Sequence, residues 1–275
     1  MTRKKSRRSG LLIWISLASC LTVSAFILLP LIQMLFQPSP ESIGQAIGDR
    51  NVRKAIGLSL YTAGWAAALS FFFGTPFAYL LARKSFPGKK LVESIVDLPI
   101  MIPHPVIGIA ILGIVGREHW LGKLLMNAGI RVMGSITGIV TVLTFVGLPF
   151  YLNTVKSGIE AIPVRLEKVS RSLGASMGQT FLRVILPLAW RSMLVGLILC
   201  SARAISEFGA VVIVAYHPMV APVLIYERFT AYGLQYSQPV AVLLIIVCLV
   251  LFIILRIISL FNTRKDEIAA TRLSA

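Results

Sequence analysis

Long apolar blocks separated by short polar segments run along this chain. The blocks cover residues 11–36, 56–82, 92–116, 135–157, 188–216 and 238–262. An α-helix rises 1.5 Å per residue, so about 20 apolar residues cross the hydrocarbon core of a bilayer. The pattern therefore predicts an all-α polytopic membrane protein with six transmembrane helices.

The composition supports this prediction. Of the 275 residues, 56% are hydrophobic and the mean hydropathy is +0.83, which is too apolar for a water-soluble domain of this length. Residues 1–10 form a basic tail before the first block, as in a signal peptide. However, the block is far longer than the roughly 7–15 apolar residues of a signal-peptide core, so we expect an uncleaved first span.

The net charge of +16 would suggest nucleic acid in a soluble protein, but here its distribution indicates membrane orientation. Basic residues concentrate in 1–10, 83–90, 156–191 and 256–272, which would all lie on one side. Cytoplasmic segments of membrane proteins are enriched in Lys and Arg. We therefore expect both termini to be cytoplasmic, including the tail 263–275, with lipid and no nucleic acid as a partner.

Neither catalytic nor metal-binding residues stand out. Cys20, Cys200 and Cys248 all lie within apolar blocks, which supports neither a disulfide framework nor a zinc site. The eleven acidic residues are scattered, and Gly122-Lys123 lacks the Ser or Thr that follows the lysine of a phosphate-binding loop. We expect no cofactor, and no ATP hydrolysis by the chain itself.

The segment 156–191 is too polar to enter lipid. Its pattern predicts a helix starting at Pro163, with apolar positions every three or four residues up to Leu173. Gly174 should end it, because glycine reaches positive φ without a steric clash. A second short amphipathic helix should follow and close at Pro187. Two short helices around a glycine are typical of a docking element for a soluble partner.

The third block contains Pro99, Pro103 and Pro105 near its start, which should break the helix. Two interpretations stay open: a proline-kinked packing helix, or a helix that lines a translocation path. His104 lies inside the broken turn, where a lone histidine is more often a packing residue than a ligand.

Small and hydroxyl side chains form stripes on two other blocks. The second block places Ser59, Thr62, Ala66 and Ser70 on one helical face, and the fourth places Thr137, Thr141 and Thr144 on another. Such stripes permit close helix packing, although they could also offer hydrogen-bond donors to an anion.

The fifth block carries two charges. Arg203 lies twelve residues beyond Arg191, so about 18 Å along a helix and near mid-membrane, and Glu207 follows four residues later on the same face. Pairing is how a helical bundle tolerates buried charges. The pair is either a structural ion pair or lies beside a permeation path.

Residues 167–187 resemble the EAA loop of ABC-importer permeases, which reads Glu-Ala-Ala, three residues, Gly, nine residues, Ile-x-Leu-Pro. Gly174 is the glycine of that pattern, and the last positions fall on Val184, Leu186 and Pro187. The Glu-Ala-Ala positions fall on 168–170, with Glu167 one residue early. The resemblance implies that one set of residues couples the chain to an ATPase: Glu167, Lys168, Ser170, Gly174, Ala175, Leu186 and Pro187.

The sequence ARAISEFGA at 202–210 is similar to the ARAxGEFGA signature of molybdate, tungstate and sulfate permeases, with Ser206 at the usual glycine. The loop 215–229 resembles the archaeal-type molybdate/tungstate branch. This resemblance implies a type-I ABC transmembrane domain over residues 54–259. It also implies a second copy of the chain, two cytoplasmic ATP-binding subunits, and an extracytoplasmic molybdate- or tungstate-binding protein.

We therefore expect a permease that passes an oxyanion across the membrane by alternating access. The candidate translocation path consists of residues from four blocks: Ser59, Thr62, Pro103, Thr141, Thr144, Arg203, Ser206 and Glu207. Sulfate or another oxyanion is an alternative substrate. A secondary transporter could use Asp97, Arg203 and Glu207 for coupling, and a membrane scaffold would carry no solute at all.

Overall fold

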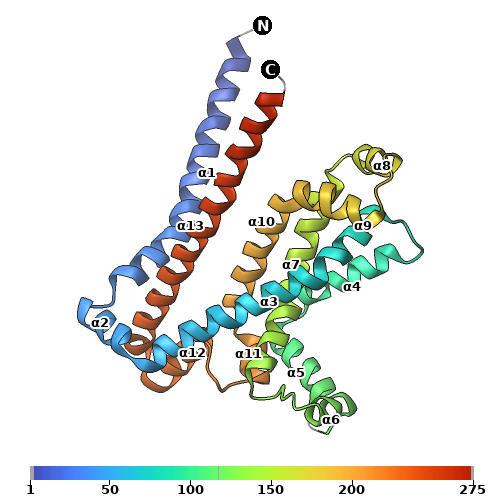
Figure 1. The fold of residues 1–275 in the computed structure, drawn as a ribbon. Helices are drawn as coiled ribbons and strands as arrows, with labels where there is room; N and C mark the ends of the chain where they lie inside the picture. Colours follow the sequence, from blue (N-terminus) through green and yellow to red (C-terminus); the bar gives the residue numbers. More distant parts are fainter. Residues whose placement is uncertain (1–2, 117, 274–275) are drawn as a thin grey trace.

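The computed structural model describes residues 3–116 and 118–273. Within these ranges the chain forms helices and turns and contains no strand. By length and composition, five helices could cross a membrane, or six if one sharply bent pair is a single span. The predicted all-α polytopic architecture is therefore confirmed (Figure 1).

The elements follow one another along the chain with short connections. In order they are α1 (Arg3–Phe36), α2 (Pro40–Gly48), α3 (Arg50–Arg83), α4 (Lys89–Met101), α5 (His104–Val115), α6 (Trp120–Asn127), α7 (Ile136–Glu160), α8 (Val164–Ser172), α9 (Met177–Thr180), the π-helix η1 (Phe181–Ile185), α10 (Leu186–Ile205), α11 (Gly209–Val214), α12 (Ala221–Tyr232) and α13 (Leu234–Leu273).

Helices α3, α7 and α10 pack against one another at the centre of the bundle. Small residues make this packing close. A Cβ atom on Gly147 of α7 would lie 2.7 Å from the Sγ of Cys200 on α10, so only glycine fits at this crossing. Tyr151 and Met193 are fully buried in the same core. These contacts pack α7 and α10 closely at the centre of the bundle.

The third block is not one continuous span, because α4 and α5 meet at an angle of 114°. Ile102 is extended, with φ −74° and ψ 134°, as expected for a residue that precedes a proline. Pro103 then precedes α5, and Pro105 lies in its first turn. The expected break is present, but it divides the block 92–116 into two helices rather than kinking one.

The fifth block also differs from the expected span 188–216. Helix α10 ends at Ile205, and α11 begins only at Gly209. The side chain of Glu207 accepts a hydrogen bond of 2.9 Å from the backbone N–H of Ala210, which stabilises the start of α11. The break therefore contains Glu207, whereas Arg203 lies in the last turn of α10.

The expectation that Pro187 closes a separate short helix is wrong. Helical structure is continuous over Met177–Ile205, with Pro187 in the first turn of α10. The π-helix η1 provides the reason, because the N–H of Leu186 bonds to the carbonyl of Phe181 five residues back. This wider turn relieves the clash that a proline ring makes with the carbonyl four residues earlier.

Figure 1 places α8 and α9 at the same end of the molecule as the terminal ends of α1 and α13. Helices α2, α6 and α12 lie at the opposite end. The loop and both terminal helix ends therefore share one side. That this side is cytoplasmic stays a prediction from the basic residues.

Candidate functional site

The loop that resembles an EAA motif is built around a glycine turn. Gly174 has φ +88°, as the sequence predicted, and lies just beyond α8. The N–H of Gly174 bonds to the carbonyl of Arg171, and the N–H of Ala175 bonds to that of Ser170. This pair of bonds is the Schellman arrangement that ends a helix. An L side chain at Gly174 would be strained by its φ angle alone.

Side-chain bonds hold the next turn against α8. The hydroxyl of Ser170 lies 3.1 Å from that of Thr180. Ser176 and Gln179 bond to each other's backbone N–H and form a capping box at the start of α9. The two short helices therefore form one compact unit that projects from the bundle.

Glu167 connects this unit to the membrane helices. Its carboxylate accepts a hydrogen bond of 2.9 Å from the hydroxyl of Tyr79 and forms an ion pair with the Nε of Arg83, both on α3. Arg83 also donates to the carbonyl of Ile162, at 2.8 Å. The ion-paired side chains are only 8% and 12% exposed. The Glu167 carboxylate is thus used within the chain, which the sequence pattern did not indicate.

Large apolar side chains are exposed on the same unit, among exposed basic residues. Leu173 is 83% exposed and Leu182 is 60% exposed. Four further apolar residues of the unit are exposed to a smaller extent, namely Val164, Leu166, Val169 and Met177. Exposed apolar patches on a polar segment commonly mark protein interaction sites. Lys168 is exposed as well.

A second cluster lies at the break between α10 and α11. Glu207 has a fully buried side chain, and its Oε2 lies 2.7 Å from Nη2 of Arg203 and 2.7 Å from Nδ1 of His104. Nη2 of Arg203 is also 2.6 Å from the His104 ring. Nη1 of Arg203 donates to the hydroxyl of Ser206 at 3.3 Å. The predicted pair is therefore a triad, with His104 brought in by the broken start of α5.

The triad is not fully enclosed. The side chains of Arg203 and His104 are 19% and 35% exposed, and Ser206 is exposed. Charged groups deep in a membrane protein face protein or water rather than hydrocarbon, because burying a charge in lipid costs several kcal/mol. The open side of the triad must therefore face a water-filled space or another protein surface.

The remaining expected path residues are not gathered around this triad. Ser59 is buried and accepts a hydrogen bond of 2.8 Å from the N–H of Ala221 at the start of α12. Thr62 is fully buried and donates to the carbonyl of Leu58 at 2.8 Å. Thr141 and Thr144 bond to carbonyls of their own helix, and Thr141 is exposed. Pro103 is also exposed, one residue before His104.

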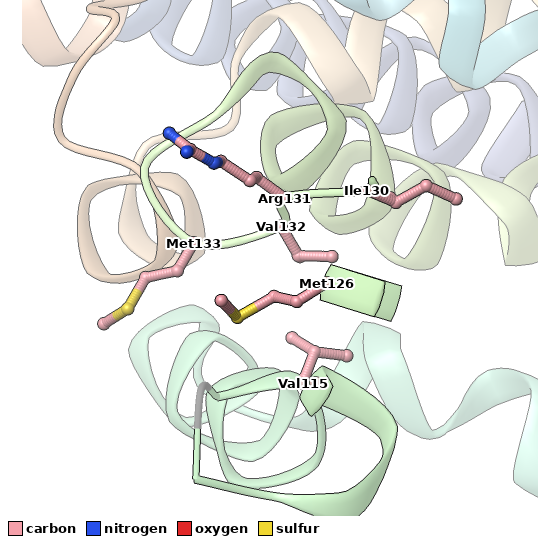
Figure 2. Close-up of a pocket in the computed structure, with 7 residues that line it drawn as sticks. Val115, Met126, Ile130, Arg131, Val132 and Met133 are labelled. Carbon is pink, nitrogen blue, oxygen red and sulfur yellow. The ribbon is translucent and has the colours of Figure 1, made fainter. Parts of the chain in front are cut away.

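A small cavity of about 180 Å³ lies beside α6, at the end remote from α8. In Figure 2 the side chains of Val115, Met126 and Val132 point toward one another, and Arg131 extends away from them. The cavity contains none of the expected path residues. Its lining carries no acidic group or histidine, and we assign no chemistry to it.

Comparisons with known proteins show the family of the chain. The family described as "Binding-protein-dependent transport system inner membrane component" matches residues 74–266. The molybdate/tungstate transport system permease protein WtpB of Thermococcus kodakarensis is 43% identical over 216 residues, which cover 78% of this chain and 82% of that protein. The sulfate transport system permease protein CysW of Synechococcus elongatus is 34% identical over 257 residues, 91% of this chain and 90% of that protein.

The same fold occurs in a solved structure, that of a bacterial alginate ABC transporter in complex with an alginate pentasaccharide-bound periplasmic protein. Its TM-score is 0.74 at 17% identity, and the match covers 96% of this chain and 97% of that chain. The architecture is thus the type-I ABC-importer permease fold.

This chain belongs to the family of binding-protein-dependent transport system inner membrane components. It is a multi-pass cell membrane protein of the class of ABC-importer permeases, whose members are transport components rather than catalysts. The resemblance to molybdate/tungstate permeases that the sequence motifs indicated is confirmed.

Proposed function

We propose that this chain is the membrane subunit of an importer for molybdate and tungstate. It would act as a homodimer, with two ATP-binding subunits on the cytoplasmic side and an oxyanion-binding protein on the other side. The observation that carries the proposal is the exposed apolar side chains around Leu173 and the connection of their unit through Glu167 to α3. This surface suits a soluble ATPase, and the connection suits the transmission of its movement.

The transmission follows from the contacts. Closure of the ATPase dimer would move α8 and α9 as one unit, because the Ser170–Thr180 contact and the Gly174 turn hold them together. Glu167 would pass this displacement to Tyr79 and Arg83 at the end of α3. Since α3 packs against α7 and α10, the three helices would shift together and open the path on one side only.

ATP and the loaded binding protein would drive this change only by binding one state more tightly than the other. The path itself would pass the open side of the triad, where Arg203 and Ser206 can contact a tetrahedral dianion. Pairing with Glu207 would keep Arg203 from holding the anion too tightly for release. The hydroxyls of Thr141 and Thr144 are further candidates on α7, whereas Ser59 and Thr62 would support packing.

Molybdate and tungstate are proposed over sulfate because the Thermococcus kodakarensis relative, named for them, is more similar than the sulfate relative. Sulfate has the same charge and shape, so the permease itself would discriminate weakly. Selectivity would then rest with the binding protein.

Replacement of Leu173 by glutamate tests the docking part of the proposal. A charge buried in an apolar interface without a partner costs several kcal/mol, so Leu173→Glu should abolish copurification with the ATPase subunit and ATP-driven uptake. Ile47→Glu is the matched control, because Ile47 is also an exposed apolar residue, in α2 at the opposite end. Normal copurification of Leu173→Glu would contradict the docking assignment.

A further inference from the structure

A cavity of about 400 Å³ lies at the end of the molecule remote from α8. It is formed by the start of α3, by α12 and by the loop that precedes α12. Its polar lining residues are Asn51, Lys54, His217 and Glu227. A cavity of this volume holds much more than one water molecule, which occupies about 30 Å³ in the liquid.

Glu227 is the unusual member of this lining. Its Oε2 atom is buried and has no hydrogen-bond partner within the described part of the chain. Arg228, the next residue along α12, is paired with Asp49 instead. A buried acceptor left without a donor costs about 1–3 kcal/mol, and more when it is charged. The geometry therefore points to a donor that the isolated subunit does not supply.

The other residues that line the cavity indicate which kind of donor would fit. Ala55, Leu58, Met219 and Leu224 give the cavity apolar sides around the carboxylate. An aliphatic stem with a cationic head matches such a site, since lysine and arginine side chains bury their methylene groups along apolar surfaces. A bound metal ion fits poorly, because Glu227 is the only carboxylate in the lining and Lys54 is cationic.

We propose that this cavity, the Glu227 socket, receives a lysine or arginine side chain of the extracytoplasmic binding protein. The inference rests on the proposed function, in which α8 meets the ATPase on the cytoplasmic side. The opposite end, where the socket opens, then faces the binding protein. The inserted cation forms a charge-assisted hydrogen bond with the Glu227 carboxylate, which is about twice as strong as a neutral one.

The test measures ATP hydrolysis by the complete transporter in proteoliposomes as the molybdate-loaded binding protein is titrated. Glu227→Gln keeps the shape of the side chain but removes its charge. It should raise the half-saturating concentration of binding protein at least tenfold, a change of about 1.4 kcal/mol. The maximal rate and the rate without binding protein should not change. Glu41→Gln, at an exposed carboxylate of α2, is the control and should change neither.

A panel of Lys→Ala and Arg→Ala variants of the binding protein identifies the inserted side chain. One binding-protein variant should raise the half-saturating concentration when it is combined with the wild-type permease. Combined with the Glu227→Gln permease, the same variant should cause no increase beyond that of Glu227→Gln alone. An unchanged concentration in Glu227→Gln would mean that water fills the socket, and would overturn the inference.

Lys54 is the donor to exclude within the chain. If Lys54→Met lowers the thermal stability of the permease and the double variant Lys54→Met with Glu227→Gln restores it, Lys54 pairs with Glu227 and the inference is wrong. Failure of the proposed function looks different: wild-type transporter would then show no stimulation by the loaded binding protein at all.

Discussion

Glu167 on α8 accepts a hydrogen bond of 2.9 Å from the hydroxyl of Tyr79 on α3, 88 residues away in the sequence. The same carboxylate is ion-paired with Arg83, one turn further along α3. The projecting unit of α8 and α9 is therefore tied by side chains to a central membrane helix. Through these contacts, a movement of the unit could be transmitted to the helical bundle.

Removal of the charge of Glu167 should uncouple transport from ATP hydrolysis. Glu167→Gln loses the ion pair with Arg83, and hydrogen bonds to charged groups contribute about 1.5–3 kcal/mol. We expect ATP-driven uptake to fall at least fivefold, while ATP hydrolysis by the complex falls much less. Both rates are measured on the same proteoliposomes.

Tyr79→Phe should produce a smaller loss of the same kind, because it removes one hydrogen bond of about 1 kcal/mol. Tyr61→Phe is the control, since Tyr61 also lies on α3 but is exposed and only packs edge-on against Trp65. If Glu167→Gln transports as much per ATP hydrolysed as the wild type, the connection plays no part in coupling.

The triad makes a prediction about stability. Arg203→Ala alone should lower the melting temperature in detergent more than the double variant Arg203→Ala with Glu207→Ala, because the single change leaves a buried carboxylate with His104 as its remaining side-chain partner. Arg191→Ala, at an exposed position of α10, should have little effect. Additive losses in the double variant would show that Arg203 and Glu207 are not coupled.

Asp49 makes a prediction about pH. Burial tends to raise the pKa of its carboxyl group, but hydrogen bonds from the backbone of Asn51 and from Arg228 outweigh this and lower the pKa below 3.8. A lowered pKa in the folded state adds stability that is present above the unfolded value and is lost as the pH falls through the folded value.

Asp49→Asn still offers an oxygen that can cap α3, but it loses the charge that faces Arg228. Both side chains are partly exposed, and ion pairs that solvent can reach contribute about 0–1 kcal/mol. The melting temperature should therefore fall by about 1–3 °C at pH 7, and this difference should shrink below pH 4. A difference that is independent of pH would mean that the Asp49 charge does not stabilise the fold.

Apolar block length was enough to predict the membrane helices, because the thickness of the bilayer fixes how many apolar residues a span needs. The turn at Gly174 was also predictable, since only its local backbone chemistry decides it. The breaks were harder to place. A proline indicates that a helix is disturbed, but whether Pro103 separates two helices and whether η1 accommodates Pro187 depend on the surrounding packing.

The partners of charged residues were the least predictable part of the site. The spacing of Arg203 and Glu207 indicated their pairing, because residues four apart share a helical face. His104 joins them across 99 residues of sequence, and Tyr79 reaches Glu167 across 88. No local pattern encodes such contacts. The position of His104 inside a proline-broken turn was the available signal for the third member of the triad.

We propose that this chain, driven by a partner ATPase, imports molybdate and tungstate. Proteoliposomes that hold the permease, its ATPase subunits and the binding protein allow the direct measurement, which is uptake of radiolabelled tungstate with unlabelled competitors. Uptake should require ATP, molybdate should compete at equal concentration, and sulfate should need about a 100-fold excess, which corresponds to about 2.7 kcal/mol. Uptake without ATP, or competition by a sugar, an amino acid or phosphate instead of molybdate, would contradict the proposed function.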